Sequence, residues 1–153
     1  MNIQNIMRQP VIVKDNISLS ETVQIMMQKK RNSVVIVNDK GEFVSEVDVV
    51  SVIKAILPDY IEEARIAAHF ASSDYFIELC KKSKDIPIGD FMMKNPKTTT
   101  IESSLMEAAV MLINSKQSRI AVLDKNKFPV GLLTRTELKQ AIGKILDIKE
   151  SNS

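Results

Sequence analysis

The residues best suited to chemistry are a threonine and a glutamate three positions apart, Thr134 and Glu137. A buried-strand pattern precedes Thr134 and apolar residues at helical spacing follow it, so a strand should pass directly into a helix there. Thr134 can cap that helix while Glu137 reaches back to its N–H. The free N–H groups and helix dipole suit a phosphate. The same pattern is also a purely structural capping box, and this stretch alone leaves both interpretations open.

The bulk composition is that of an ordinary soluble globular protein. The chain has 153 residues, of which 44% are hydrophobic and 26% charged, and a net charge of +2 spread along the chain gives no support for nucleic-acid binding. His69 and Cys80 are single residues of their types, which argues against metal clusters, catalytic triads and disulfides. Without a membrane-spanning run or a signal-peptide pattern, we expect a cytoplasmic protein that binds no membrane.

The positioning elements follow from capping and periodicity. Strand-forming residues occupy 10–13, 33–37 and 42–47, and helices are expected over 19–30 and from 49 onward. The far half repeats this order. At an offset of 86, eight positions are identical without a gap: Pro10/Pro96, Ser18/Ser104, Leu19/Leu105, Glu21/Glu107, Lys30/Lys116, Val44/Val130, Ala55/Ala141 and Ile56/Ile142. An ungapped register with preserved element order indicates an internal repeat.

The repeat predicts an α+β fold of two β-α-β-β-α copies. Neither copy is long enough to bury both faces of a small sheet, so we expect them to pack on one another through their sheets about a pseudo-twofold axis. We assign residues 1–57 to the first repeat, 58–85 to a helical linker, 86–147 to the second repeat and 148–153 to a tail.

These features resemble a tandem pair of CBS domains, also called a Bateman module. Each repeat begins with a hydrophobic-x-x-hydrophobic-Met leader, Ile3 to Met7 and Ile88 to Met92, and the second carries Gly131-Leu132-Leu133-Thr134-x-x-Glu137. The resemblance implies a non-catalytic regulatory module that binds AMP, ADP or ATP between the repeats as a regulatory ligand, with no obligatory cofactor. It also implies a homodimer and an unidentified regulated protein.

The resemblance further implies the site residues. Thr134 matches a hydroxyl residue near phosphate, Glu137 stands where the family has a ribose-binding aspartate, and Arg119 matches a place where some members present a basic residue to phosphate. Arg135 also favours a phosphate. The base wall would come from Pro10, Val11 and Ile12. Glutamate is longer than aspartate, so Glu137 can instead remain in the capping box.

The first repeat departs further from the family pattern. Asp48 replaces Thr134 and Ser51 replaces Glu137 at the 86-residue offset. A weaker second site is therefore expected there, formed by Asp48 and Ser51 with Lys97 and Thr98.

Two other functions compete with nucleotide sensing. One is a structural or protein-interaction module that binds no ligand, which the degraded first site favours. The other is S-adenosylmethionine binding, since that ligand shares the adenosine group but not the phosphate charge. An enzyme is disfavoured because no nucleophile stands near a base and only 4 glycines are available for a phosphate loop.

Overall fold

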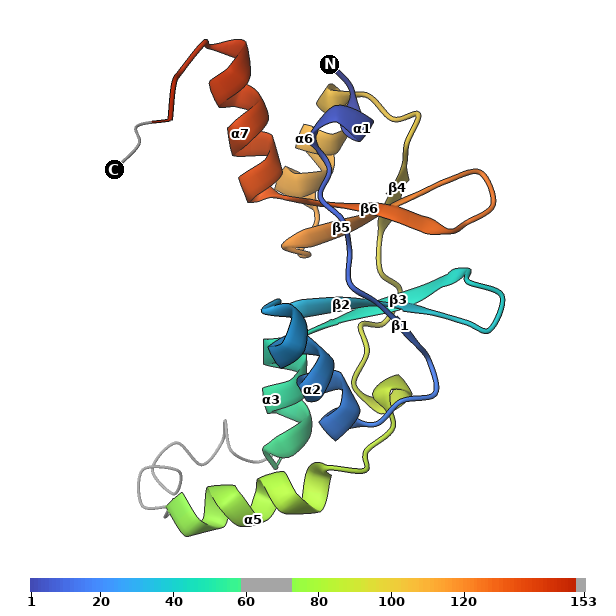
Figure 1. The fold of residues 1–153 in the computed structure, drawn as a ribbon, viewed down its shortest axis with the longest axis vertical. Helices are drawn as coiled ribbons and strands as arrows, with labels where there is room; N and C mark the ends of the chain where they lie inside the picture. Colours follow the sequence, from blue (N-terminus) through green and yellow to red (C-terminus); the bar gives the residue numbers. More distant parts are fainter. Residues whose placement is uncertain (59–72, 151–153) are drawn as a thin grey trace. The chain divides into compact units, whose positions relative to one another are not determined.

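The computed structural model describes residues 1–58 and 73–150 (Figure 1). The first half forms α1 (Ile3–Ile6), β1 (Ile12–Lys14), α2 (Leu19–Lys29), β2 (Ser33–Val37), β3 (Phe43–Asp48) and α3 (Val49–Ile56). The second forms α5 (Ser73–Ser83), the 3-10 turn η2 (Ile88–Asp90), β4 (Thr98–Thr100), α6 (Leu105–Asn114), β5 (Arg119–Leu123), β6 (Pro129–Thr134) and α7 (Arg135–Ile145). The α+β class and the two β-α-β-β-α repeats are confirmed.

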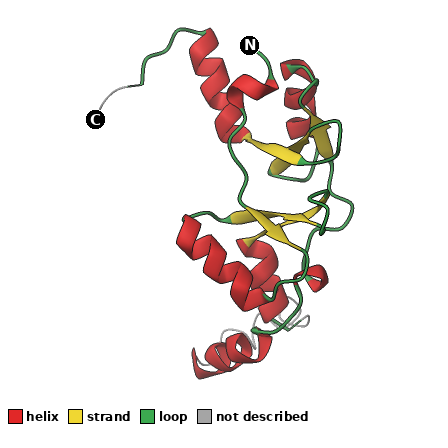
Figure 2. Cartoon of the chain, turned by 45° about the vertical axis from the view of Figure 1, so that its right-hand side comes forward, coloured by secondary structure: helices red, strands yellow, loops and turns green. Residues whose placement is uncertain are grey.

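Each repeat builds one three-stranded sheet, in the order β1-β2-β3 or β4-β5-β6. The first two strands run parallel in both sheets, because a helix connects them and returns the chain to the same end. β5 and β6 are antiparallel and place Arg119 opposite Thr134. Helices cover one face of each sheet (Figure 2).

Local capping sets the beginnings of the helices. Ser18 and Glu21 form a capping box at α2, and Ser104 and Glu107 form the equivalent box at α6. In each box, the serine oxygen accepts from the glutamate N–H and the glutamate carboxylate accepts from the serine N–H. These boxes satisfy N–H groups that a helix otherwise leaves unpaired.

The leader of each repeat packs into the unit of the other repeat. The chain divides into a second-repeat unit, made of Met1–Pro10, Gly41–Phe43 and Asn95–Ser153, and a first-repeat unit, made of Val11–Lys40 and Val44–Lys94. Ile3 is fully buried in the core of the former and Ile88 in the core of the latter. The predicted domain boundaries follow sequence order and keep each leader with the repeat that it precedes. In the compact units, each leader belongs with the other repeat.

The N-terminal leader packs closely against Gly131, which has no side chain. A Cβ at this buried position would lie 2.1 Å from Sδ and 2.7 Å from Cγ of Met7. Met7 as placed therefore leaves no room for a side chain at residue 131. The next residue, Arg8, then pairs with Leu132 through both backbone bonds, with N···O distances of 3.0 and 2.9 Å.

The predicted helical linker is partly described. α5 forms over Ser73–Ser83, within the predicted range 58–85, while the part of that prediction over 59–72 lies outside the described residues. The chain after α5 returns to α2, where the carbonyl of Ile86 accepts from the N–H of Leu19 at 2.8 Å. Within residues 1–58 and 73–150, the helices are all too short or too polar to cross a bilayer.

Replacing Gly131 with alanine should displace Met7 and loosen the leader. We expect the free energy of unfolding to fall by about 1–3 kcal/mol, the usual range for overpacking, when measured by urea denaturation. Gly143→Ala is the matched control, because a Cβ at Gly143 has no neighbour within 4 Å. That variant should gain about 0.4–1 kcal/mol. Equal stability of Gly131→Ala and the unmodified protein would contradict this packing role.

Candidate functional site

The junction of β6 and α7 is built as the sequence predicted. Thr134 is the N-cap, with extended backbone angles, and its Oγ1 accepts from the N–H of Thr136 at 3.1 Å. Glu137 Oε2 accepts from the N–H of Thr134 at 2.8 Å and also from its hydroxyl group. The capping box therefore exists, and it holds one carboxylate oxygen of Glu137.

The other carboxylate oxygen of Glu137 faces an arginine from the N-terminal leader. Glu137 is only 4% exposed. Its Oε1 lies 3.7 Å from Nε of Arg8, whose side chain is 41% exposed. A buried carboxylate needs hydrogen bonds or an opposite charge to offset its desolvation. Here the N–H and hydroxyl of Thr134 supply the hydrogen bonds, and Arg8 supplies the opposite charge.

Arg119 reaches the same site from β5. Directly opposed residues of an antiparallel pair project to the same face, so Arg119 and Thr134 share one face of the sheet. The side chain of Arg119 donates from Nη1 to Oγ of Ser118 at 3.2 Å. Gln117 holds this end of β5 by donating to the carbonyls of Arg119 and Lys97, at 3.1 and 3.2 Å. Arg119 and Thr134 are thus paired across the β5–β6 hairpin, and Glu137 joins Thr134 through the capping box.

The neighbours of Arg135 differ from those of Arg119, Thr134 and Glu137. It lines an apolar groove between α6 and α7, with Leu112, Ile113 and Leu138 among its neighbours. A phosphate contact by Arg135 stays a prediction.

The predicted base wall is divided between the two units. Pro10 ends the leader in the second-repeat unit, while Val11 and Ile12 belong to the first-repeat unit. Val11 packs against the core of its unit, and Ile12 is 48% exposed. The participation of these three residues in one site with Thr134 remains a prediction.

In the predicted weaker site, Asp48 is the N-cap of helix α3. Oδ1 of Asp48 accepts from the N–H and the hydroxyl of Ser51, at 2.9 and 3.1 Å. Lys97 and Thr98 belong to the other compact unit. Asp48 thus places a negative charge at the N-terminus of α3, where a phosphate would be repelled.

Sequence reasoning missed Arg8. Its leader motif was recognised, but sequence order assigned the motif to the first repeat and therefore away from Glu137. The usable signal is that Arg8 directly follows the leader methionine, Met7, and that β6 carries a glycine, Gly131, over which another segment can pack closely.

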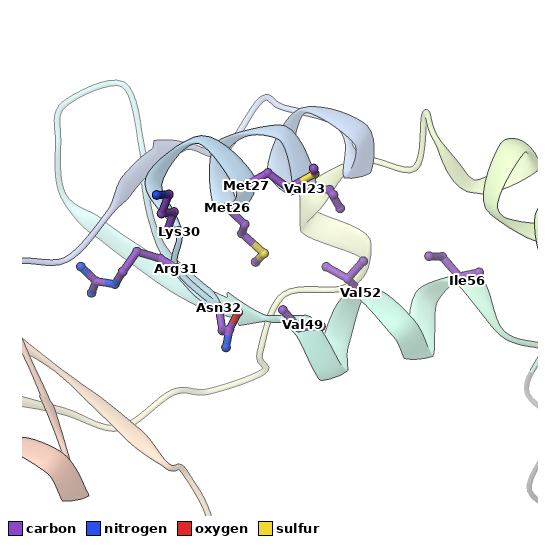
Figure 3. Close-up of a pocket in the computed structure, with 9 residues that line it drawn as sticks. All are labelled: Val23, Met26, Met27, Lys30, Arg31, Asn32, Val49, Val52 and Ile56. Carbon is purple, nitrogen blue, oxygen red and sulfur yellow. The ribbon is translucent and has the colours of Figure 1, made fainter.

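Two apolar grooves occupy equivalent places in the repeats. Figure 3 shows the groove between α2 and α3, which encloses ≈ 440 Å³. The groove between α6 and α7 encloses ≈ 480 Å³. Six lining positions correspond at the 86-residue offset: Val23/Ala109, Met26/Leu112, Met27/Ile113, Val49/Arg135, Val52/Leu138 and Ile56/Ile142.

The grooves are apolar and open to solvent. Met27 is 73% exposed and Ile113 is 80% exposed. Exposed apolar residues gathered in a patch indicate a contact surface. In the part of the chain that the structure describes, no three His, Cys, Asp or Glu side chains gather as a metal site would require.

Comparison with known proteins identifies both repeats. A family model of the CBS domain matches residues 3–58 and 88–144. Uncharacterized protein MJ1426 of Methanocaldococcus jannaschii is 23% identical over 153 residues, covering 93% of this chain and 91% of that protein. The match therefore extends over both repeats of the chain.

Solved structures share the fold. CBSX2, a CBS-pair protein from Arabidopsis thaliana, has a TM-score of 0.77 at 19% identity, covering 97% of this chain and 98% of its own. The complex of CBSX2 with AMP has a TM-score of 0.70 at 20% identity, with coverages of 95% and 98%. The CBS domain pair of MJ0100, solved with 5′-methylthioadenosine and S-adenosyl-L-methionine, has a TM-score of 0.69 at 19% identity, with the same coverages.

Removing the carboxylate of Glu137 should destabilise the fold more than removing an exposed capping glutamate. We expect Glu137→Ala to lower the free energy of unfolding by about 2 kcal/mol, because it leaves buried donors and Arg8 without their acceptor. Glu107→Ala removes the same capping role at an exposed position and should lower it by about 0.5 kcal/mol. Equal losses in urea unfolding would show that burial and Arg8 add nothing to the capping box.

Proposed function

Since this chain belongs to the CBS-domain family, we propose that it is a non-catalytic regulatory module that binds an adenine nucleotide. CBS-pair proteins are in general regulatory modules, and structural neighbours have been solved with AMP and with S-adenosyl-L-methionine. The ligand would be AMP, ADP or ATP, and its binding would be reported to a regulated protein. The observation that carries the proposal is the position of Arg119 opposite Thr134 at the N-terminus of α7.

The charges at this junction favour a phosphate over a sulfonium. The α7 N-terminus contributes the positive end of a helix dipole, and an arginine fork matches phosphate oxygens. S-Adenosylmethionine carries a positive sulfur that Arg119 would repel. It therefore remains the alternative ligand, and a phosphate-bearing nucleotide is the proposal.

We assign the ribose to Glu137. A carboxylate oxygen accepts from ribose hydroxyls through charge-assisted hydrogen bonds, which are about twice as strong as neutral ones. Oε2 of Glu137 is held by the capping box, so Oε1 is the oxygen left for the ribose. Without nucleotide, that oxygen faces Nε of Arg8. Ribose binding then requires Arg8 to shift.

We expect one strong site per chain. Asp48 and Ser51 replace the threonine and glutamate in the first repeat, and the Asp48 carboxylate is engaged by Ser51. At the positions equivalent to Glu137 and Arg119, the first repeat has Ser51 and Ser33, which carry no charge. Any ligand there would bind weakly or be uncharged.

A second candidate function is protein interaction through the two apolar grooves. The grooves present exposed apolar residues at equivalent positions in both repeats, including Met27 and Ile113. We propose that a second copy of the chain covers them and forms a homodimer. This contact is compatible with nucleotide binding, because the grooves are lined by residues other than Thr134, Glu137 and Arg119.

Loss of Arg119 should weaken nucleotide binding. We expect Arg119→Gln to reduce AMP affinity about 10-fold or more by isothermal titration calorimetry, because a charge-assisted contact is lost. Lys125→Gln, which removes an exposed cation at the opposite end of the β5–β6 hairpin, should leave affinity unchanged. ADP, ATP and S-adenosylmethionine complete the panel. Indifference to all four ligands would overturn the sensor proposal and leave the interaction module.

Charges introduced into the grooves should separate the dimer. We expect Met27→Glu with Ile113→Glu to sediment as a monomer at concentrations where the unmodified protein sediments as a dimer, because the contact would bury two carboxylates per chain. Phe76→Glu is the control, since Phe76 is 50% exposed on α5 and lies outside both grooves. A monomeric unmodified protein, or a dimer in the double variant, would contradict this contact.

A further inference from the structure

The N-terminal leader places Arg8 on the same face as the candidate nucleotide site. Arg8 and Leu132 are opposed in an antiparallel bridge, so their side chains project to the same face of the sheet. Thr134 follows Leu132 by two residues in β6 and therefore shares that face. Arg119 shares it too, through its pairing with Thr134. Arg119 is thus directly opposite Thr134, and Arg8 lies diagonally across from it on the other side of β6.

Two arginines and one carboxylate meet at this junction. Nε of Arg8 lies 3.7 Å from Oε1 of Glu137, and Arg119 lies opposite Thr134. The α7 N-terminus adds a partial positive charge at the same place. Such an arrangement stabilises an anion and gives no comparable gain to a neutral ligand.

We propose that Arg8 binds the phosphate of the nucleotide and selects phosphate-bearing ligands over uncharged adenosine. This inference rests on the proposed nucleotide function. In the absence of nucleotide, Arg8 neutralises Oε1 of Glu137 at 3.7 Å. When the ribose hydroxyls donate to that oxygen, they replace Arg8 as its partner, and the guanidinium turns to the phosphate oxygens. Each charged group then retains a partner in both states.

The side chain of Arg8 is suited to this exchange. Its closest approach to Glu137 is through Nε, and at 3.7 Å the contact is an ion pair longer than a hydrogen bond. A guanidinium presents its N–H groups as a planar fork, which binds phosphate oxygens in pairs. With 41% of the side chain exposed, Arg8 can move without opening the core.

The first-repeat unit has a neutral residue at the equivalent place. There the N–H of Met93 donates to the carbonyl of Glu46 at 3.0 Å, as the N–H of Arg8 does to Leu132. Glu46 and Leu132 are separated by the 86-residue offset. The position that carries a cation beside Thr134 therefore carries a methionine beside Asp48. The arginine is specific to the half that retains the threonine and glutamate.

The test compares AMP with adenosine on the full chain by isothermal titration calorimetry. For Arg8→Gln, we expect AMP affinity to fall about 10- to 100-fold, as for loss of a charge-assisted contact. Adenosine affinity should stay equal or rise, because the ribose then no longer displaces Arg8 from Glu137. Arg8→Lys keeps the charge without the fork and should lie between these limits for AMP. Lys125→Gln is the matched control for loss of one positive charge and should leave both affinities unchanged. Circular dichroism and urea unfolding check that each variant is folded.

Three results would overturn the proposal, and they differ in what else they reject. If the unmodified protein binds AMP and adenosine equally, no group on the protein reads the phosphate, although an adenosine site still exists. If Arg8→Gln weakens both ligands equally, Arg8 only positions Glu137 and the nucleotide function stands. If the unmodified protein binds neither ligand, the nucleotide function falls together with the role of Arg8.

Discussion

The packing of the N-terminal leader on β6, where Met7 lies against Gly131, is the contact on which the candidate site depends. Because residue 131 has no side chain, Met7 lies over β6, and the backbone of Arg8 pairs with Leu132 immediately afterwards. The same placement buries Ile3 in the core with Val122 and Leu133. The packing of the leader thus both completes the core and places Arg8 beside the α7 N-terminus.

The two repeats share their architecture but differ at the residues that could bind a ligand. Both halves retain capped helices, equivalent strand order and equivalent grooves between their helices. The helix N-cap is a threonine in one half and an aspartate in the other. The residues around the two N-caps differ as well. Thr134 lies opposite Arg119 and caps its helix together with Glu137, which Arg8 contacts, whereas Asp48 caps its helix by accepting from Ser51. The carboxylate of an aspartate N-cap already interacts with the positive end of the helix dipole, so the dipole favours an anionic ligand less at that helix.

Local features of this chain were readable from its sequence, and tertiary ones were not. The capping box of Thr134 and Glu137 depends on residues three apart, and the hairpin register that brings Arg119 to Thr134 depends on one short turn. Arg8 joins the site only because the leaders are exchanged between units, which involves segments more than 120 residues apart. The burial of Glu137 follows from the same exchange. Arg135 lines the groove between α6 and α7, and its contact with a phosphate stays a prediction.

The central claim is that an adenine nucleotide binds with its phosphate at the N-terminus of α7. The most direct measurement is a ¹⁵N-labelled amide spectrum titrated with AMP. The account predicts the largest shifts at the N–H groups of Thr134 to Glu137, with changes at the side-chain Nε–H of Arg8 and Arg119 and little change at Asp48 to Ser51. Shifts centred on Asp48, or no shift at saturating AMP, would contradict it.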